Sequence, residues 1–238
     1  MSAQPFQFKE FTIQQDRTAM KVGTDGVLLG AWVALENQID SVLDIGTGTG
    51  LIALQIAQRS DIATIDALEI EPDAYEQAVE NFENSDWGDR LFCYHASLLE
   101  FSNEMDEKYD LIISNPPYYN DTYKKLEPKR AIARHTDALS FETLLSATAK
   151  LLSANGTCAF IIPFGEEQKF LAFALENKLF PNRITRVKGH INTPFKRTLL
   201  HLSFDNKSPV IDELTIETER HVYTEKYKNL VQDFYLKL

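Results

Sequence analysis

The chain has little positive charge, little cysteine and no long apolar run, and each shortage excludes a class of protein. Lys and Arg number 24 against 35 Asp and Glu, so the formal net charge is −11. Such a charge argues against broad electrostatic capture of a polyanion. No run approaches the roughly eighteen apolar residues of a membrane span. The N-terminus, MSAQPFQFKEF, has neither the basic nor the apolar region of a secretory signal. We therefore expect a cytoplasmic protein without membrane contact.

Cysteine usage supports the same compartment. The two cysteines, Cys93 and Cys158, each lie in an apolar run typical of a strand. Structural thiols in a reducing compartment explain this pattern better than a disulfide or a metal site. We therefore expect no metal centre.

Charge is distributed unevenly along the chain. Residues 178–201 contain six basic side chains and no acidic one, and residues 119–136 contain five basic and two acidic. Acidic residues concentrate at 69–89 and 205–219. These blocks predict a dipolar protein with one basic face.

Segments with strand and helix patterns alternate along the chain. Apolar runs predict strands at 41–46, 63–70, 91–96, 109–114, 157–163, 183–191 and 198–204. Helical patterns occupy 25–35, 50–59, 72–84, 140–152, 166–178 and 223–236, with Ser140 as an N-cap and Asn155-Gly156 ending the fourth helix. Residues 6–14 alternate and predict a short hairpin. A long loop over 115–138 is expected to be functional.

This alternation predicts an α/β fold with a doubly wound, mostly parallel, seven-stranded sheet. The crossovers should be right-handed, and the last two strands should form a closing antiparallel pair. No linker divides the chain, so we expect a single domain.

The stretch Asn115-Pro116-Pro117-Tyr118 follows the apolar run 109–114 directly. Two prolines stiffen the turn and remove N–H groups. The carboxyl end of a parallel strand is where open α/β sheets bind ligands. Backbone carbonyls and the Asn115 amide can therefore accept hydrogens from a planar substrate bearing an NH2 group, with Tyr118 beneath its face. A proline turn that merely ends the strand is the alternative.

The loop Asp44-Ile45-Gly46-Thr47-Gly48-Thr49-Gly50 joins the first strand of the alternating series to its helix. Its spacing is neither that of the dinucleotide fingerprint nor that of a Walker loop. An anion at Asp44 repels a pyrophosphate but suits a cationic amino-acid group, such as that of S-adenosylmethionine. The alternative is a tight turn without a ligand.

A carboxylate at the end of the next strand can accept both hydroxyls of a ribose. Glu69 has this position, twenty-five residues after Asp44. Glu71 and Asp66 compete with it for the role. A solvated strand-end charge is the simpler alternative.

The motifs VLDIGTGTG, ALEIEP and NPPY, in this order, resemble class I S-adenosylmethionine-dependent methyltransferases that modify amino groups. Three further stretches, QQDRTAMKVGTDGVLLGAW, ARHTDALSFETLL and PFKRTLLHLSF, are similar to bacterial tRNA adenine-N6 methyltransferases acting in the anticodon loop of a valine tRNA. The similarity extends over nearly the whole chain, and KVGTDGVLLGAW is its most specific part.

The resemblance implies a site for S-adenosylmethionine, with residues 1–40 covering it and residues 41–238 forming the methyltransferase domain. The implied cofactor contacts are Asp44, Gly46, Thr47, Gly48, Gly50, Glu69, Ser97, Thr24 and Asp25. Ser97 stands where many members carry an Asp facing the adenine, so a charged acceptor is lost there. Helix capping is an alternative for Thr24 and Asp25.

The resemblance also implies an adenine substrate within a tRNA. Asn115, Pro116, Pro117 and Tyr118 would then be catalytic, with Tyr119 as a substitute for Tyr118. The implied phosphate contacts are Arg134, His135, Lys196 and Arg197. A solvated charged face is the alternative for this basic set. No obligatory protein partner is evident, and the oligomeric state stays open.

Three rival functions share these motifs. Protein glutamine methyltransferases that modify release factors present the same NH2 geometry, but they carry a larger domain ahead of the glycine loop. Adenine-N6 DNA methyltransferases need a sizeable recognition region. A non-catalytic RNA-binding module would not need Asp44, Glu69 and Asn115 together.

Overall fold

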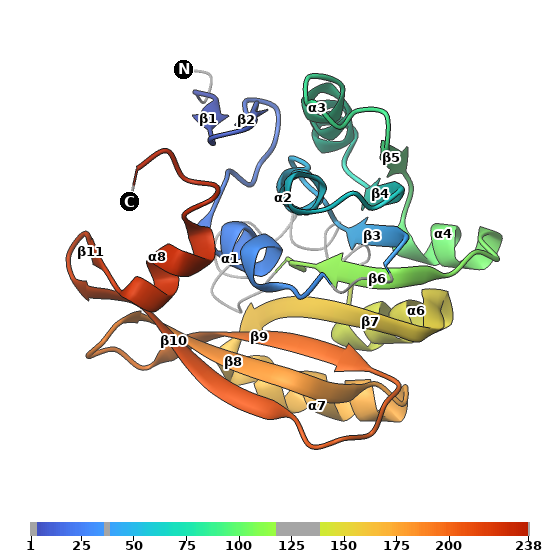
Figure 1. The fold of residues 1–238 in the computed structure, drawn as a ribbon. Helices are drawn as coiled ribbons and strands as arrows, with labels where there is room; N and C mark the ends of the chain where they lie inside the picture. Colours follow the sequence, from blue (N-terminus) through green and yellow to red (C-terminus); the bar gives the residue numbers. More distant parts are fainter. Residues whose placement is uncertain (1–3, 36–38, 118–138, 238) are drawn as a thin grey trace, which may run out of the picture.

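A mixed nine-stranded sheet runs through the molecule (Figure 1), which the computed structural model describes over residues 4–35, 39–117 and 139–237. Its strand order is β11-β10-β8-β9-β7-β6-β3-β4-β5. The strands are β3 (Ser41–Ile45), β4 (Thr64–Glu69), β5 (Leu91–His95), β6 (Tyr109–Ser114), β7 (Leu152–Pro163), β8 (Phe180–His190), β9 (Phe195–Ser203), β10 (Val210–Glu219) and β11 (Val222–Tyr223). A separate hairpin pairs β1 (Phe6–Gln7) with β2 (Thr12–Ile13), as expected.

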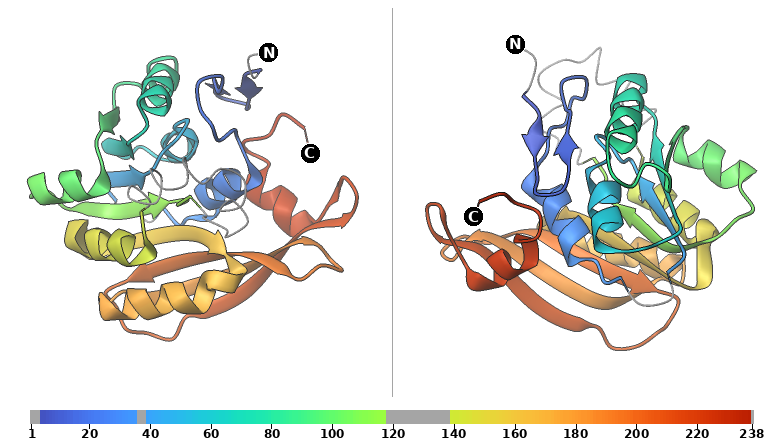
Figure 2. Two further views of the ribbon diagram at one scale, coloured as in Figure 1. Left: turned by 180° about the vertical axis from the view of Figure 1, so that it is seen from behind. Right: turned by 45° about the horizontal axis from the view of Figure 1, so that its top comes forward.

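Helices cover both faces of the sheet (Figure 2), so the predicted doubly wound architecture is confirmed. One face carries α1 (Thr24–Trp32), α2 (Leu51–Arg59), α3 (Pro72–Glu83) and α8 (Glu225–Val231). The other carries α4 (Leu98–Glu104), α6 (Phe141–Leu151) and α7 (Glu167–Glu176), which follows the short 3-10 helix η2 (Phe164–Glu166). Each face has its own apolar core, with the sheet between them.

The five strands from β5 to β7 are parallel, as predicted. Both faces of such strands are covered, which explains their nearly continuous apolar sequences. Leu43 of β3 packs into one core and Val42 into the other, and both side chains are fully buried. The alternation of strand and helix therefore predicted this half of the sheet well.

The sheet has nine strands where seven were expected. The predicted antiparallel pair is β8 and β9, and β9 lies between β7 and β8. Beyond them, β10 pairs with β8 and β11 with β10. The acidic sequence of β10 hides its strand character, because Leu214 is its one fully buried side chain. Only the two-residue strand β11 lies beyond β10, and a strand so near the sheet edge needs little apolar sequence.

Two predicted helix ends are wrong. Helix α6 ends at Leu151, and Asn155-Gly156 lies inside β7 instead of closing the helix. A Cβ at Gly156 would stand 2.9 Å from the Tyr109 carbonyl oxygen, and the β6–β7 register shifts there. This glycine therefore marks an irregular strand with a close backbone approach.

The C-terminal helix is also shorter than predicted, since α8 spans only Glu225–Val231. Thr224 is its N-cap and accepts a hydrogen bond from the Tyr227 N–H at 3.2 Å. Tyr223 belongs to β11. Helix α4 was not predicted; a capping box at Ser97 and Glu100 begins it.

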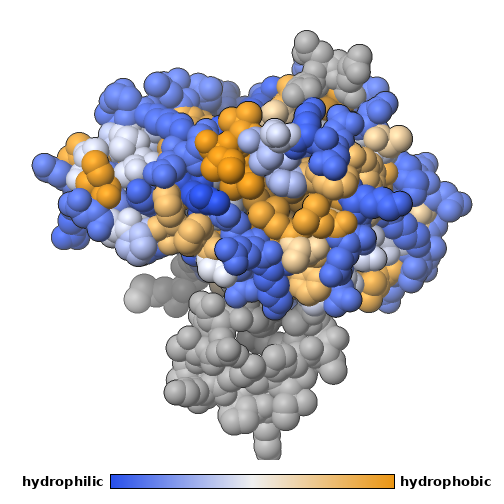
Figure 3. Space-filling view, turned by 90° about the horizontal axis from the view of Figure 1, so that it is seen from below, coloured by the Kyte–Doolittle hydropathy of each residue, from blue (hydrophilic) through white to orange (hydrophobic). Residues whose placement is uncertain are grey.

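Among the described residues, no helix is long and apolar enough to cross a membrane. Figure 3 looks at the underside of the view in Figure 1, and its hydrophobic patches are separated by hydrophilic atoms. Val210 and Ile211, at the start of β10, contribute exposed apolar surface. Scattered exposure of this kind is ordinary for a folded domain.

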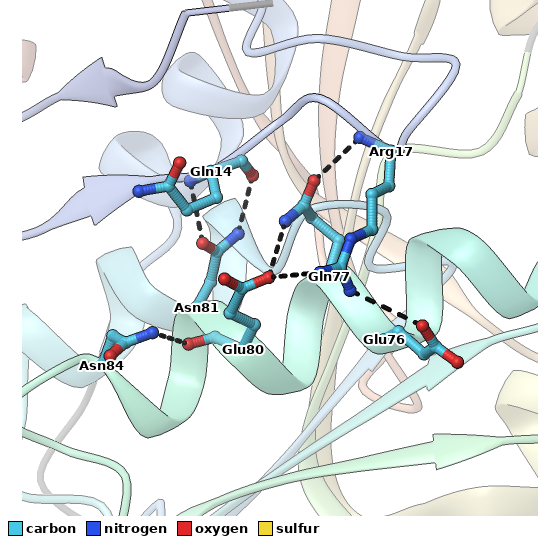
Figure 4. A network of polar contacts seen from close by, with 7 residues as sticks. All are labelled: Gln14, Arg17, Glu76, Gln77, Glu80, Asn81 and Asn84. Carbon is cyan, nitrogen blue, oxygen red and sulfur yellow. Dashed lines mark hydrogen bonds and ion pairs between the residues drawn. The ribbon is translucent and has the colours of Figure 1, made fainter. Parts of the chain in front are cut away.

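The N-terminal segment is fastened to helix α3 by polar contacts (Figure 4). Asn81 accepts from the Gln14 N–H at 2.8 Å and donates to the Gln14 carbonyl at 2.9 Å. The same side chain donates to the Thr49 carbonyl at 2.8 Å. Gln77 accepts from the Arg17 N–H at 3.0 Å. One buried amide thus joins the N-terminal segment, α3 and the glycine loop.

We predict that Asn81→Ala lowers the free energy of unfolding by about 2–4 kcal/mol, because it leaves buried backbone groups without partners. Chemical denaturation monitored by circular dichroism measures this. The matched control is Asn84→Ala, at the exposed end of the same helix, where the amide donates to the Glu80 carbonyl. We expect that control to change stability by less than about 1 kcal/mol. Equal effects in the two variants would contradict the anchoring role.

Candidate active site

Strand register brings the sequence motifs to one edge of the sheet. Ile45, the last residue of β3, pairs with Leu68 of β4 and with Ser114 of β6. The Ser114 hydroxyl also donates to the Ile45 carbonyl at 2.7 Å. The glycine loop, Glu69 and Asn115 therefore meet at the carboxyl ends of three adjacent strands, where ligands bind in open α/β sheets.

The glycine loop requires glycine for two different reasons. Gly46, Gly48 and Gly50 have φ of 70°, 60° and 81°, a region that other residues rarely adopt. A Cβ at Gly50 would stand 2.5 Å from the Phe82 ring, so helix packing excludes a side chain there. Cβ atoms at Gly46 and Gly48 would meet nothing within 4 Å. These two face open space, as expected where backbone approaches a ligand.

Glu69 ties the glycine loop to the end of β4. Its Oε2 accepts from the Gly48 N–H at 2.8 Å. Its Oε1 accepts from the N–H groups of Ile70 and Glu71, each at 2.9 Å. The residue is 8% exposed; Oε1 already accepts two hydrogen bonds, and Oε2, which accepts one, retains lone-pair capacity for a further donor.

The two competitors of Glu69 are occupied otherwise. Asp66 is buried within β4, accepts from the Tyr109 hydroxyl at 2.6 Å, and has its pKa raised by burial. Glu71 is exposed at the N-cap position of α3. Of the three carboxylates, Glu69 is the one that accepts from the glycine loop.

Asp44 is fully buried beneath the loop. The Thr47 hydroxyl donates to its Oδ2 at 2.6 Å, whereas Oδ1 has no hydrogen-bond partner among the described residues. Burial raises the pKa of the Asp44 carboxyl to about 7; the bond from Thr47 and the backbone N–H of Ala53 oppose this shift, and the nearby Glu69 charge adds to it. A buried acceptor without a donor is costly unless a ligand supplies one.

These features fit S-adenosylmethionine. Open space over Gly46 and Gly48 admits a ligand backbone, and the unpaired Asp44 oxygen suits an ammonium group. Glu69 retains acceptor capacity on Oε2 for a ribose hydroxyl at the same edge. The donor and acceptor chemistry of the loop thus matches that of the cofactor.

Asn115, Pro116 and Pro117 follow β6 directly, with Asn115 half-buried, Pro116 buried and Pro117 exposed. The adjoining Ser114 is fully buried and held to β3. The start of this turn is therefore fixed relative to the glycine loop. Tyr118, the predicted stacking ring, and its substitute Tyr119 lie outside the described residues.

The first turn of α1 lies beside the glycine loop. A Cβ at Gly26 would stand 3.0 Å from a Leu51 methyl, at the first residue of α2. The N-cap residue is Gly23, so Thr24 does not cap the helix through its side chain. The Asp25 carboxylate accepts from Arg197 Nε at 2.6 Å. This ion pair connects α1 with the start of β9.

Ser97 caps helix α4. Its hydroxyl donates to Glu100 Oε2 at 2.7 Å, and the Glu100 N–H donates back to Ser97 at 3.2 Å. The bonds from the Ser97 hydroxyl and the Ser97 backbone N–H to the Glu100 carboxylate lower the pKa of that carboxyl. The capping box gives Ser97 a structural role, and its contact with the cofactor adenine stays a prediction.

The basic residues predicted to contact RNA are only partly within the described chain. Arg134 and His135 lie outside it. Lys196 is exposed and Arg197 pairs with Asp25. Because β9 is antiparallel to β7, with Arg197 opposite Pro163, both basic residues lie at the edge where β7 ends. They therefore share the edge of the candidate site.

Sequence reasoning missed Asn81 and Phe82, which hold the glycine loop from α3. Asn81 binds the Thr49 carbonyl, and the Phe82 ring packs where a side chain at Gly50 would lie. A signal was present, because Gln77 and Asn81 occupy the same helical face as Ala74 and Ala78. Two amides on an apolar face indicate buried polar contacts.

Solved structures of low sequence identity share the fold. A predicted O-methyltransferase from Agrobacterium tumefaciens matches with a TM-score of 0.68 and 18% identity, over 88% of this chain and 96% of its own. A ribosomal protein L11 methylase from Lactobacillus delbrueckii subsp. bulgaricus matches with a TM-score of 0.52 and 19% identity, over 75% of this chain and 76% of its own. These similarities show a Rossmann-like methyltransferase fold.

Sequence relatives are much closer. The model of the methyltransferase small domain matches residues 26–162. A tRNA1(Val) (adenine(37)-N6)-methyltransferase from Christiangramia forsetii is 63% identical over the full length of both chains. One from Flavobacterium johnsoniae is 56% identical over 98% of this chain and all of its own, and one from Trichodesmium erythraeum is 45% identical over both full lengths. The chain belongs to the tRNA1(Val) (adenine(37)-N6)-methyltransferase family.

Proposed function

We propose that this protein transfers the methyl group of S-adenosylmethionine to the exocyclic amine of an adenine in tRNA, at position 37 of a valine tRNA as the relatives' names state. The observation that carries the proposal is the register that sets Asn115 beside the glycine loop. Family membership supplies the substrate class. Residues 1–40 cover the cofactor in this proposal, and residues 41–238 form the methyltransferase domain.

S-adenosylmethionine, when bound, supplies an electrophilic methyl group on a sulfonium that needs no further activation. Asp44 would bind the ammonium group through its unpaired oxygen, and Glu69 would accept a hydrogen bond from the ribose hydroxyls. Gly46 and Gly48 leave room for the ligand. Thr47 orients Asp44 through its hydroxyl. Thr24, Asp25, Gly50 and Ser97 complete the proposed cofactor site.

The adenine amine is a poor nucleophile because its lone pair is delocalised into the ring. The new N–C bond would form as the S–C bond of the sulfonium breaks, so that S-adenosylhomocysteine leaves. Positive charge develops on nitrogen, and the surplus proton passes to water after transfer, so early deprotonation is unnecessary. The Asn115 side-chain oxygen and the Pro116 carbonyl accept hydrogen bonds from the two N–H groups of the amine, and these bonds stabilise the positive charge. Pro117 stiffens the turn, and Tyr118 stacks on the base, a contact of about 1–3 kcal/mol.

The substrate nucleotide lies in a single-stranded loop and can be splayed out at modest free-energy cost. Lys196 and Arg197 at the site edge, with Arg134 and His135, contact phosphates in this proposal. We assign the protein to the cytoplasm, where tRNA is modified. Its oligomeric state does not enter the mechanism.

Methylation of a glutamine side chain is the second candidate, because an amide presents the same NH2 geometry. The family assignment favours tRNA. Incubation with labelled S-adenosylmethionine and separate pools of tRNA, rRNA, DNA and protein tests both. Label in tRNA, released as N6-methyladenosine on digestion, supports the proposal; label in protein alone overturns it.

We predict that Asn115→Ala lowers kcat for tRNA methylation by about 10²–10³-fold, because an acceptor for the developing charge is lost. The cofactor Kd should change less than about threefold. Single-turnover kinetics and calorimetric titration measure the two quantities. Asn155→Ala, on the exposed amino-terminal part of β7, is the matched control and should retain full activity. Unchanged turnover in Asn115→Ala removes that residue from the mechanism.

Cofactor affinity should rise with pH below about pH 7. The pKa of Asp44 is about 7 in the empty protein, and a bound ammonium favours its carboxylate, so binding releases a proton. As the pH rises toward the pKa, the cofactor Kd should fall by up to about tenfold per pH unit. Above the pKa, the Kd should level off. Titration calorimetry in buffers of different ionisation enthalpy counts the proton. Asp44→Asn should abolish the dependence; a wild-type Kd independent of pH contradicts this role.

Binding of tRNA should weaken with salt, with a slope of log K against log [salt] near −0.7 for each single-stranded phosphate contacted. Lys196→Ala should reduce the magnitude of that slope by about one contact. Filter binding at several salt concentrations measures it. Lys207→Ala is the control, because Lys207 follows the opposite end of β9 and pairs with Asp205. Identical slopes for wild type and Lys196→Ala exclude this phosphate contact.

A further inference from the structure

A cavity of about 380 Å³ lies beside the candidate active site and shares only Thr24 with the proposed cofactor site. It is lined by α1 and by segments near the end of the chain, namely the end of β8, β10, β11, α8 and the C-terminal tail. Its lining includes Thr24, Gly189, Glu217, Tyr223, Tyr227, Tyr235 and Lys237. We call this cavity the tyrosine pocket.

Three tyrosines supply aromatic walls. The rings of Tyr223 and Tyr227 have centroids 5.2 Å apart and planes inclined by 37°. Burial, the first cause, raises the pKa of both Tyr227 and Tyr235. The Tyr235 ring is in turn supported by Phe8 of the N-terminal hairpin, at 5.8 Å between centroids. The walls are thus braced from outside the pocket.

Polar groups without partners face the same space. The side chain of Glu217 forms no hydrogen bond or ion pair with any described residue, and it is half-buried at the pocket. Lys237, also at the pocket, is exposed and likewise has no ion-pair partner within the described ranges. An acceptor and a cation are therefore available to a ligand held between the rings.

Gly189 keeps one wall open. A Cβ at this position would meet nothing within 4 Å, although the residue lies inside strand β8. Glycine weakens a strand interior and often marks a place where a ligand approaches the backbone. A Cβ at residue 189 would therefore strike no protein atom at the wall of this pocket.

The first turn of α1 separates the tyrosine pocket from the cofactor site. Thr24 lines the pocket, and Gly26 packs against Leu51 at the end of the glycine loop. Between them, Asp25 holds Arg197, a proposed phosphate contact. One short piece of helix thus borders both spaces, and a basic side chain lies at the boundary.

We propose that the tyrosine pocket binds a second unpaired base of the substrate RNA, outside the methylated position. Aromatic rings stack on any base, Glu217 accepts an exocyclic amine, and Lys237 meets the adjoining phosphate. A planar heterocycle with a neighbouring anion uses all three groups, whereas an aliphatic ligand would use none of the polar ones. The inference rests on the proposed function, because it assumes an RNA substrate.

The test uses the full-length protein and the anticodon stem-loop of a valine tRNA, with each loop nucleotide other than the target replaced in turn by an abasic residue. Gly189→Leu fills the pocket. We expect it to raise KM for the intact stem-loop by about 5- to 100-fold, the range that stacking of one base implies. Its kcat and cofactor Kd should stay within about twofold of wild type.

The abasic series identifies the base. One abasic replacement should raise the KM of the wild-type enzyme by a similar factor. The same replacement should not raise the KM of Gly189→Leu further, because the contact between base and pocket is already lost in that variant. Glu217→Gln should raise KM by about two- to tenfold, while Glu219→Gln, an exposed residue of the same strand, should not. Glu217→Gln also provides a test that does not depend on the folding of Gly189→Leu.

The outcomes separate the two proposals. If wild type methylates the stem-loop and neither Gly189→Leu, with a native melting temperature, nor Glu217→Gln changes KM, the pocket binds no base. The inference is also overturned if the KM increase caused by Gly189→Leu and that caused by each abasic replacement are fully additive as free energies. If wild type transfers no label to any tRNA, the proposed function itself fails, and the pocket proposal fails with it.

Discussion

The arrangement of this site depends on one buried carboxylate. Glu69 accepts three backbone N–H groups, one from the glycine loop and two from the turn that follows β4. Hydrogen bonds to a charged acceptor contribute about 1.5–3 kcal/mol each, roughly twice as much as neutral ones. Since the loop has glycines with positive φ and few side chains to pack, these bonds and the Asn81 amide restrict it. A loop held open in this way can meet a ligand without a large loss of entropy.

The sequence predicted the parts of the molecule that local pattern controls. Apolar runs identified the parallel strands, and the register of β3 and β6 brought Asp44, Glu69 and Asn115 to one edge as expected. The sequence-based prediction failed where tertiary contacts determine the local structure. Leu214 and the half-buried Ile216 anchor β10 in the core, so an acidic strand near the sheet edge had the composition of a loop. Gly156 was predicted to end a helix, but in the structure its missing Cβ lets the backbone of β7 lie close to the Tyr109 carbonyl. The side-chain links from Asn81 to Thr49 and from Asp25 to Arg197 join distant segments, and no spacing rule predicts them.

Segments outside the central sheet surround its functional edge. The N-terminal segment reaches the glycine loop through Asn81, and its hairpin pairs with the C-terminal tail at Phe8 and Tyr235 (Figure 1). Helix α1 packs against the start of α2 while its Asp25 holds β9. Both ends of the chain therefore border the same region. Lys196 and Arg197 thus lie at this edge in a protein whose formal net charge is −11.

The position of β9 has a consequence for biosynthesis. This strand lies between β7 and β8 although it is made after both, so the nascent chain exposes the unpaired edge of β7 until Ser203 has left the ribosome. The fully buried Leu199, Leu200 and Leu202 of β9 join the two cores on opposite faces of the sheet. Completion of the fold must therefore wait for the last sixth of the sequence, after a slow, non-local pairing step. A partly made chain has the glycine loop but lacks the strand that carries Lys196 and Arg197, so this edge of the candidate site is completed only when the fold closes.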